Sequence, residues 1–358
     1  MKSEAVYQAI VARIQEGFWK SGEQILSERQ LSSLFSVSRV TVRNAISQLV
    51  GEGVLEYRQG RLGTFVAAIP CEKQNEDAGL IGIALDNYTP AFASFLLEGI
   101  HDSLWKRNYH TLYCNTHLGD ETVVQKIASF IQEGVKGLIF SPLLTDSGTV
   151  VSRKVLALAK QASIPVVQLD RYVWDNHSSK VQCDNTDAMY RMMQRLIKLG
   201  IRRPLVLSGI STSSTEERLE GVRRACSEQG ISVSTVLVDE VAYYQEQSIT
   251  FLDPKAMKLE AYDAFIALNQ VLSKVAVRLA KNCHSQIITA GVSASELEVV
   301  NEYSVIQPLY HIGYTAASLL LEHIEKPDIP QSTILVQARQ WPFESSDTAS
   351  FKEEGLYP

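Results

Sequence analysis

The chain has two parts with different patterns of apolar and polar residues. The first part shows helical spacing followed by a short alternating stretch, and the second part repeats short apolar runs and helical stretches in turn. A polar, aperiodic segment beginning near Pro70 separates them and predicts a linker. The 358 residues also exceed one ordinary core at about 150 residues per domain. We therefore expect a first domain, a linker, a second domain and a loose polar tail, at residues 1–68, 69–78, 79–345 and 346–358.

The first domain is predicted to be a small α+β winged helix-turn-helix. Helical spacing covers 3–17, 27–35 and 38–51, and Ser36 and Ser38 offer hydroxyls suited to an N-cap. Apolar residues of the third helix recur at three- and four-residue steps and share one face: Val42, Ala45, Ile46, Leu49 and Val50. A hairpin is predicted after the glycines that end this helix. Apolar and polar residues alternate at 54–58, a glycine-containing turn follows at 59–63, and a second strand is expected at 64–66.

The third helix carries chemistry suited to DNA. Arg39 and Arg43 lie four residues apart, away from the apolar face, with Thr41 and Asn44 beside them. Helices that enter the major groove use such residues at their N-terminal end. Arg61, between two glycines at the hairpin tip, can reach a phosphate or a minor groove. The alternative is a helical domain with merely solvated arginines, which the helix stop and the hairpin oppose.

This domain resembles the winged-helix DNA-binding domain of the GntR family. The resemblance is carried by Tyr7, Ile10, Gly17, Gly22, Ser27-Glu28-Arg29, Ser38-Arg39, Thr41-Val42-Arg43, Leu49, Gly53 and Gly63-Thr64-Phe65-Val66. It implies DNA contacts from Arg29, Arg39, Thr41, Arg43, Gly60 and Arg61.

The second domain is predicted to be α/β with parallel sheets. Strand patterns occur at 80–85, 110–114, 136–141, 164–169, 204–208, 233–238 and 264–268. Helical patterns fall between and after them, at 92–108, 120–133, 152–162, 186–199, 216–229 and 270–282. This alternation predicts parallel sheets with helices on both faces, and the length allows two sheets.

The second domain resembles the LacI/GalR effector domain, which has the two-lobed fold of periplasmic sugar-binding proteins. The matching residues are Gly82-Ile83, Glu98-Gly99-Ile100, Asn115, Gly137-Leu138-Ile139, Ser141-Pro142, Ile164-Pro165-Val166-Val167, Asp170-Arg171, Asp184-Asn185, Arg218, Gly221, Asn269, Gln307-Pro308, Gly313 and Leu320. The resemblance implies lobe 1 at about 79–172 and 308–326, and lobe 2 at about 173–307 and 327–345. Together with the GntR-type head, it resembles arabinose-repressor-type transcriptional regulators.

Candidate effector ligands follow the predicted strands, because ligands of open α/β sheets bind beyond the strands' carboxyl ends. Asp86, Asn87, Asp170, Asn269 and Gln270 stand at such positions, and Arg218 is expected to open a helix after a loop. The resemblance favours Arg218, Asp170, Gln270 and Gln307. Aromatic residues that could cover a sugar ring are Phe92, Tyr172, Trp174, Tyr243 and Tyr244.

A structural role is the alternative for these polar residues, which can cap helices or pair across the lobes. It is stronger than the ligand role for Asp184 and Asn185 and weaker for Arg218. At Gln270 the chain departs from the sugar-binding relatives, which commonly have aspartate. A glutamine offers an acceptor and two N–H donors without charge, so a sugar still fits.

Charge and cysteine content favour a cytoplasmic, site-specific DNA binder. The chain has net charge −6, but residues 1–66 carry +2, so the remainder carries −8. The five cysteines have no metal or redox spacing and indicate reduced thiols. No apolar run approaches the ~18 residues of a membrane span, and the N-terminus lacks a signal core.

The chain is predicted to be a sequence-specific transcriptional regulator controlled by a small carbohydrate in the cleft. The family resemblance implies repression rather than activation. The expected partners are double-stranded operator DNA, a sugar-like effector and a second copy of the chain. No enzyme motif, cofactor site or metal spacing is found in the sequence. Two alternatives stay open: a regulator whose second domain only dimerises, and a solute-binding protein.

Overall fold

The computed structural model folds into two compact units, Met1–Asp77 and Ala78–Pro358. We call them the head and the body. The structure describes residues 2–15, 17–58, 63–67, 79–85, 90–116, 122–143, 148–173, 178–240, 258–283 and 286–343. The predicted linker and tail lie outside these residues.

The head is a helix-turn-helix with a two-stranded wing. Its elements are α1 (Lys2–Gln15), α2 (Glu28–Phe35), α3 (Arg39–Gly51), β1 (Leu55–Tyr57) and β2 (Thr64–Val66), and the two strands pair antiparallel. Ser38 is the N-cap of α3, as predicted, and accepts from the amide of Thr41. Ser36 instead ends α2 in the left-handed conformation, at φ 52°. The apolar faces of α1, α2 and α3 enclose one core, so the hydrophobic pattern of this segment is confirmed.

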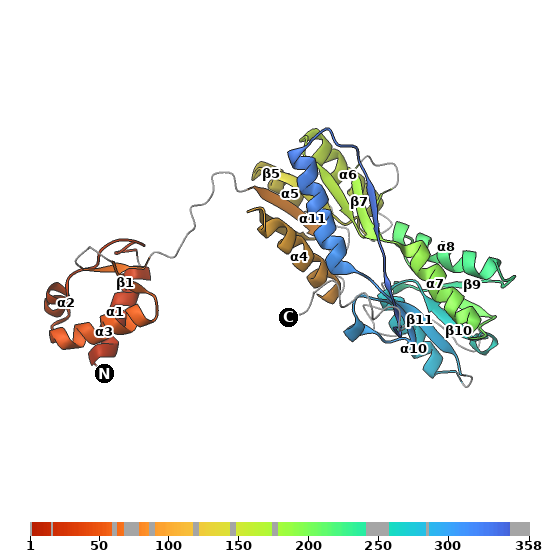
Figure 1. Ribbon diagram of the computed structural model, residues 1–358, viewed down its shortest axis with the longest axis horizontal. Coiled ribbons are helices and arrows are strands. Elements are labelled where there is room, and N and C mark those ends of the chain that lie inside the picture. The colour runs from red at the N-terminus through yellow and green to blue at the C-terminus, as the bar shows by residue number, and fades with distance from the viewer. Residues whose placement is uncertain are drawn as a thin grey trace. The chain divides into compact units, whose positions relative to one another are not determined.

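The body has two lobes, each built on a six-stranded sheet (Figure 1). Lobe 1 has the all-parallel order β13-β7-β6-β5-β3-β4. Its strands are β3 (Leu80–Leu85), β4 (His110–Asn115), β5 (Val135–Phe140), β6 (Val166–Leu169), β7 (Ser179–Cys183) and β13 (Thr333–Val336). Its helices are α4 (Pro90–Trp105), α5 (Thr122–Gln132), α6 (Gly148–Gln161) and α11 (Leu309–Glu325).

Lobe 2 has the order β14-β12-β11-β10-β8-β9, in which only the edge strand β14 is antiparallel to its neighbour. Its strands are β8 (Pro204–Ser208), β9 (Ser234–Leu237), β10 (Ala264–Ala267), β11 (Ile288–Ser293), β12 (Tyr303–Ile306) and β14 (Arg339–Trp341). Its helices are α7 (Asn185–Lys198), α8 (Ser213–Ser227) and α10 (Gln270–Lys281), with 3-10 turns at Leu259–Ala261 and Glu296–Glu298. The two-lobed parallel fold is confirmed.

The predicted division between the lobes is wrong at two of its three crossings. The chain leaves lobe 1 after β7, not near residue 172, and β13 returns to the sheet of lobe 1 before β14 joins lobe 2. The crossing at Gln307-Pro308 is where the sequence placed it. Strand β7 was missed because Ser179, Lys180 and Gln182 made it look like a polar loop. Partners far away in the sequence satisfy these groups: Ser179, for example, bonds His323 and Gln331.

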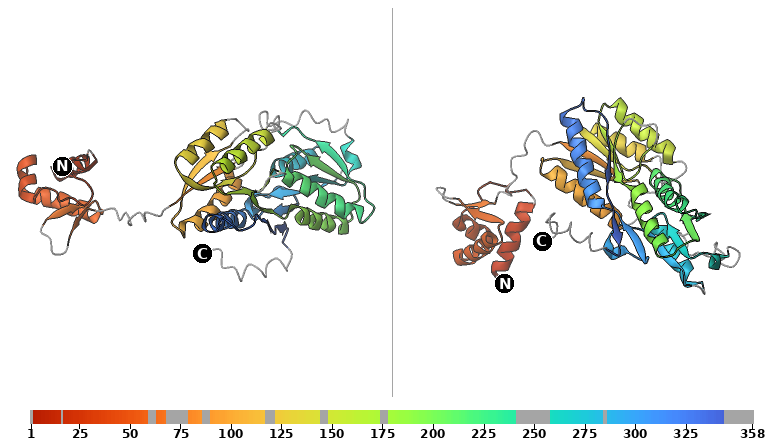
Figure 2. Two further views of the ribbon diagram at one scale, coloured as in Figure 1. Left: turned by 90° about the horizontal axis from the view of Figure 1, so that it is seen from above. Right: turned by 45° about the vertical axis from the view of Figure 1, so that its right-hand side comes forward.

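Helices cover both faces of the lobe 1 sheet, as the views in Figures 1 and 2 show. Alternate residues of one strand therefore enter different cores: Ile139 packs with α4 and α11, and Leu138 and Phe140 pack with α5 and α6. This explains why β5 is an apolar run without visible alternation.

Close approach of paired helices depends on glycine. A Cβ at Gly99 of α4 would lie 2.0 Å from the carbonyl oxygen of Tyr310, and one at Gly313 of α11 would lie 2.2 Å from that of Leu96. In lobe 2, a Cβ at Gly221 of α8 would lie 2.3 Å from the carbonyl oxygen of Thr186. These backbone atoms cannot rotate away, so a larger side chain would separate the helices.

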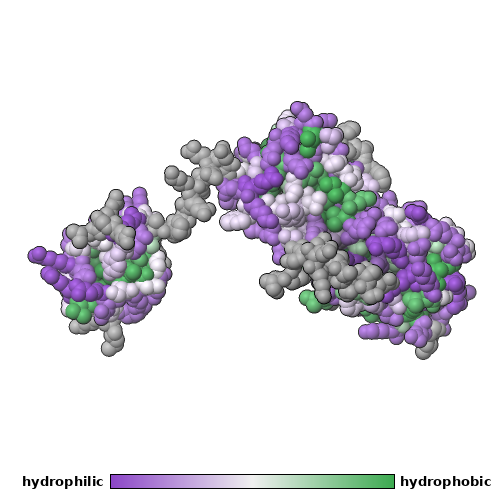
Figure 3. All heavy atoms as spheres, in the orientation of Figure 1, coloured by the Kyte–Doolittle hydropathy of each residue, from purple (hydrophilic) through white to green (hydrophobic). Residues whose placement is uncertain are grey.

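Hydrophilic side chains cover most of the visible face of the body (Figure 3). Within the described part of the chain, no helix combines the length and apolar character that crossing a membrane requires. The cysteines the structure describes, at 114, 183, 226 and 283, are free thiols.

Candidate functional site

The N-terminal end of α3 presents the candidate DNA-binding groups of the head. Arg39 is exposed, and so is Val40, with 65% of its surface accessible. Thr41 is half-buried, and its hydroxyl lies 2.8 Å from that of the cap residue Ser38. An exposed valine beside an arginine gives this end both an apolar and a charged group, which suits base edges carrying a thymine methyl.

Arg43 is held by an acidic partner that sequence reasoning did not consider. Its Nε and Nη2 donate to the Glu28 carboxylate of α2, at 3.0 and 2.8 Å. This pairing lowers the pKa of Glu28 and raises that of Arg43. Both side chains reach solvent, and ion pairs of this kind contribute little to stability. Arg43 can therefore exchange Glu28 for a phosphate or base at small cost.

The remaining predicted DNA contacts are Arg29, Gly60 and Arg61. Arg29 lies exposed on α2, beside Glu28. Gly60 and Arg61 lie outside the described residues. The roles of all six predicted contacts stay predictions.

The candidate effector site is a pocket between the two lobes, of about 710 Å³ including the space open to solvent. Lobe 1 contributes Phe92, Asp170 and Arg171, and lobe 2 contributes Ile210, Thr212, Ser214, Thr215, Arg218, Glu240, Asn269, Gln270, Val271 and Gln307.

The pocket brings together the predicted effector ligands that the structure describes. Asp170 follows β6, Asn269 and Gln270 follow β10, and Gln307 follows β12, all at carboxyl ends of strands. Phe92 comes from the first turn of α4. Asp86, Asn87, Trp174, Tyr243 and Tyr244 lie outside the described residues. Tyr172 does not line the pocket: its ring lies under the Lys180 ammonium group, 4.2 Å away, and its hydroxyl donates to Glu217.

Arg218 is a buried anchor of the pocket wall. Its three nitrogens donate to Asn185 Oδ1, the Leu268 carbonyl oxygen and Gln307 Oε1, at 2.8, 2.9 and 2.9 Å. The prediction that it opens a helix is wrong: α8 begins at Ser213, with Thr212 as its N-cap. Arg218 has five N–H groups, so two remain for a ligand beside these three bonds.

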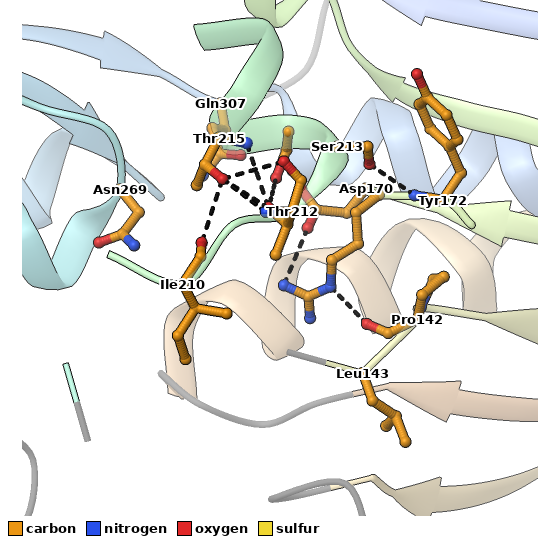
Figure 4. Close-up of polar contacts among 12 residues, drawn as sticks. Pro142, Leu143, Asp170, Tyr172, Ile210, Thr212, Ser213, Thr215, Asn269 and Gln307 are labelled. Carbon is orange, nitrogen blue, oxygen red and sulfur yellow. Dashed lines mark hydrogen bonds and ion pairs between the residues drawn. The ribbon is translucent and has the colours of Figure 1, made fainter. Parts of the chain in front are cut away.

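Asp170 reaches the pocket through an unusual backbone conformation. Its φ is +67°, in the left-handed region that few non-glycine residues adopt. Arg171 Nη1 lies 3.7 Å from Asp170 Oδ2, and Arg171 Nε donates to the carbonyl oxygen of Pro142 at 2.6 Å (Figure 4). Backbone strain of this kind occurs where geometry serves a site, which is consistent with a ligand role for Asp170.

Glu240, which the sequence analysis did not select, is a buried carboxylate of the same pocket. Asn269 Nδ2 donates to both of its oxygens, at 3.0 and 2.9 Å, and the Ile210 amide donates to Oε1 at 3.1 Å. Burial raises the pKa of Glu240, and these hydrogen bonds oppose the rise. The signal was present: Glu240 comes soon after β9, at a strand's carboxyl end.

A second polar group, the Glu217 cluster, joins the lobes beside the pocket and consists of Tyr172, Gln182, Asn185 and Glu217. The Glu217 carboxylate on α8 accepts from the Tyr172 hydroxyl, Gln182 Nε2 and Asn185 Nδ2, each at 3.0 Å. Tyr172 and Gln182 belong to lobe 1. Asn185 also accepts from Arg218, so the cluster is continuous with the pocket wall. The structural role favoured for Asp184 and Asn185 is confirmed, since Asp184 caps α7.

The lobes also meet directly at the start of α8. The Tyr172 amide, in lobe 1, donates to the Ser213 hydroxyl at 2.9 Å (Figure 4). This bond connects the segment that follows Asp170 to the first turn of α8, and both of these line the pocket.

A winged-helix head joined to a two-lobed body with an interlobe pocket defines a class, the ligand-responsive DNA-binding proteins. The model of the periplasmic binding protein domain matches residues 81–328, and the chain belongs to this family. The model described as bacterial regulatory proteins, gntR family, matches residues 2–66, so the family resemblance of both parts is confirmed.

One similar protein spans about nine-tenths of the chain, and two solved structures match most of it. The arabinose metabolism transcriptional repressor of Geobacillus stearothermophilus is 25% identical, over 90% of this chain and 91% of that protein. A LacI family transcriptional regulator from Enterococcus faecium, solved with bound ribose, has a TM-score of 0.59 at 21% identity, covering 73% of this chain and 96% of the other. A complex of the transcriptional regulator CelR with cellobiose has a TM-score of 0.60 at 19% identity, with 84% and 88% coverage. At these identities the solved structures show the fold alone.

Proposed function

We propose that the chain is a sequence-specific transcriptional repressor whose DNA binding is controlled by a small carbohydrate in the interlobe pocket. The observation that carries the proposal is the presence in one chain of an arginine-bearing helix end and a pocket lined by polar groups at strand ends. The proposal assigns no catalytic step. A protein bound to bacterial operator DNA works in the cytoplasm.

Dimerisation through the body is part of the proposal. One winged helix contacts only a few base pairs, so useful specificity needs two half-sites and two heads. A pseudo-palindromic operator then matches a twofold dimer. Light scattering on the full chain is expected to give about twice the mass of 39.8 kDa.

The effector must bind the DNA-free state more tightly than the DNA-bound state, because a ligand shifts an equilibrium only by that difference. Coupling free energies of about 1–3 kcal/mol are usual, which is about 5–150-fold in operator affinity. The related repressor's name makes arabinose the first sugar to try, and the bound ligands of the similar structures add ribose and cellobiose.

The proposal is tested in two stages. Full-length protein selects operator sequences from a random DNA pool, and fluorescence anisotropy then measures operator affinity with and without each sugar. Arg218→Ala is compared with Arg223→Ala, an exposed arginine on the same helix. We expect the Arg218→Ala protein to bind operator and to stay bound at a sugar concentration that releases the wild-type and Arg223→Ala proteins.

Because Arg218→Ala leaves three acceptors without their donor, its folding is checked by circular dichroism and thermal unfolding. Release of a folded Arg218→Ala protein at the wild-type sugar concentration contradicts the role of Arg218. Operator binding that no sugar changes supports the purely dimerising body. Sugar binding without DNA binding supports a solute-binding protein.

A further inference from the structure

Glu240 is a buried acid of the pocket, and its carboxylate fits there because the neighbouring residue 209 is a glycine. Only 6% of its surface is exposed. A Cβ at Gly209, just after β8, would lie 1.7 Å from Glu240 Oε1, so the carboxylate sits directly against the glycine backbone. A side chain at position 209 would displace it. The pocket therefore contains a buried acid in a fixed place.

The amide of Asn269 is committed to holding this acid. Its Oδ1 accepts from the Leu272 amide at 2.9 Å and caps α10, and its Nδ2 donates to both oxygens of Glu240. The Ile210 amide also bonds Oε1. A carboxylate has about four acceptor sites, so Oε2, which accepts from Asn269 alone among the described groups, keeps capacity for another donor. Asn269 is the positioning residue and Glu240 the acceptor.

Most N–H groups that the pocket's two arginines are seen to use are, in contrast, directed at the protein itself. Arg218 donates to Asn185, Leu268 and Gln307, and Arg171 donates to the carbonyl oxygen of Pro142 and faces Asp170. A phosphate or carboxylate ligand would have to compete with these protein acceptors for all but two N–H groups of Arg218, and it would meet the negative charge of Glu240. A sugar hydroxyl needs only an acceptor, which Glu240 provides.

We infer that Glu240 is a specificity-determining residue, whose carboxylate accepts a hydroxyl of an uncharged sugar and excludes phosphorylated and acidic sugars. This inference rests on the proposed carbohydrate control of the same pocket.

Isothermal titration calorimetry on the full chain tests the inference with two sets of probes. The neutral set is L-arabinose, D-ribose and cellobiose, and the charged set is ribose 5-phosphate, glucose 6-phosphate and glucuronate. We expect wild-type protein to bind a neutral sugar and no charged one. Glu240→Gln keeps the shape of the side chain but removes its charge, so binding should weaken about tenfold or more.

The matched control is Glu220→Gln, an exposed acid on α8 that does not line this pocket. It should bind sugar as wild type does. Thermal unfolding of the sugar-free proteins is measured in parallel: Glu240→Gln leaves Asn269 Nδ2 and the Ile210 amide with one neutral acceptor, so its melting temperature should fall to some extent whatever the role of the acid. A merely structural acid would lower the melting temperature and leave the sugar affinity of the folded protein unchanged.

Two outcomes overturn the inference while carbohydrate control stands: a charged sugar that binds as tightly as the neutral ones, and a Glu240→Gln protein with wild-type affinity. If the wild-type chain binds none of these sugars, the proposed function fails and the inference fails with it.

Discussion

The Glu217 cluster should contribute to the stability of the body in a measurable way. Glu217→Gln keeps the length and shape of the side chain but leaves one carbonyl oxygen where the carboxylate had two. The carboxylate accepts from Tyr172, Gln182 and Asn185. The tyrosine hydroxyl can turn to accept from the new amide, so the other two donors keep one neutral acceptor.

The cost follows from the change of charged to neutral hydrogen bonds. A bond to a charged group contributes about 1.5–3 kcal/mol and a neutral one about 0.5–1.5 kcal/mol. Because Glu217 is only half-buried, we expect a total loss of about 1–2 kcal/mol. For a domain of this size each kcal/mol lowers the melting temperature by about 2–4 °C, so the variant should melt about 2–8 °C lower.

Differential scanning calorimetry on the full chain measures this effect, with Glu220→Gln as the control on the same helix. Sugar affinity is measured in parallel, because Asn185 connects Glu217 to Arg218. A Glu217→Gln melting temperature equal to that of the control would refute the reasoning, since it would mean that the cluster contributes nothing to holding the lobes together.

Three other predictions concern the head and the two lobes. Arg39→Ala and Arg43→Ala should weaken operator binding, and loss of a phosphate contact should lower the salt-dependence slope by about one, as gel shifts at several salt concentrations can show. Gly221→Ala should destabilise the body by about 1–3 kcal/mol, because its Cβ meets the Thr186 carbonyl oxygen; urea unfolding measures it, and an unchanged midpoint would contradict the packing. Burial lowers the pKa of His323 from 6.5, so the unfolded chain binds the proton first and stability should fall as pH drops below about 6.5. That pH dependence should be reduced in His323→Gln and would count against the argument if it persisted unchanged.

Much of the fold was predictable because its elements carry local signals. Ser38 and the apolar positions of α3 define a helix by spacing and capping alone, and the glycine turn separates two strands of the wing. The alternation of apolar runs and helices gave the parallel sheets. Strand β7 was not predicted because its polar residues form hydrogen bonds with His323, Gln331 and Glu217, which lie far away in the sequence.

The candidate site was partly predictable for the same reason. The rule that ligands bind at strand ends found Asp170, Asn269 and Gln270 and would have found Glu240 if it had been applied after β9. It could not show that Asn269 is committed to holding Glu240, because this depends on the distance between two loops.

The three crossings between the lobes have a consequence for synthesis of the chain on the ribosome. Neither lobe is one continuous stretch: the sheet of lobe 1 is completed by β13, which follows all of lobe 2 except β14. At about 5–20 residues per second, the stretch from Cys183 to Thr333 takes about 8–30 s to synthesise. Throughout that interval the edge of β7 lacks its strand and α4 lacks α11, leaving apolar surface uncovered. The head, complete by Val66, can fold long before, so nascent chains should present a finished DNA-binding unit attached to a body that still needs protection from aggregation.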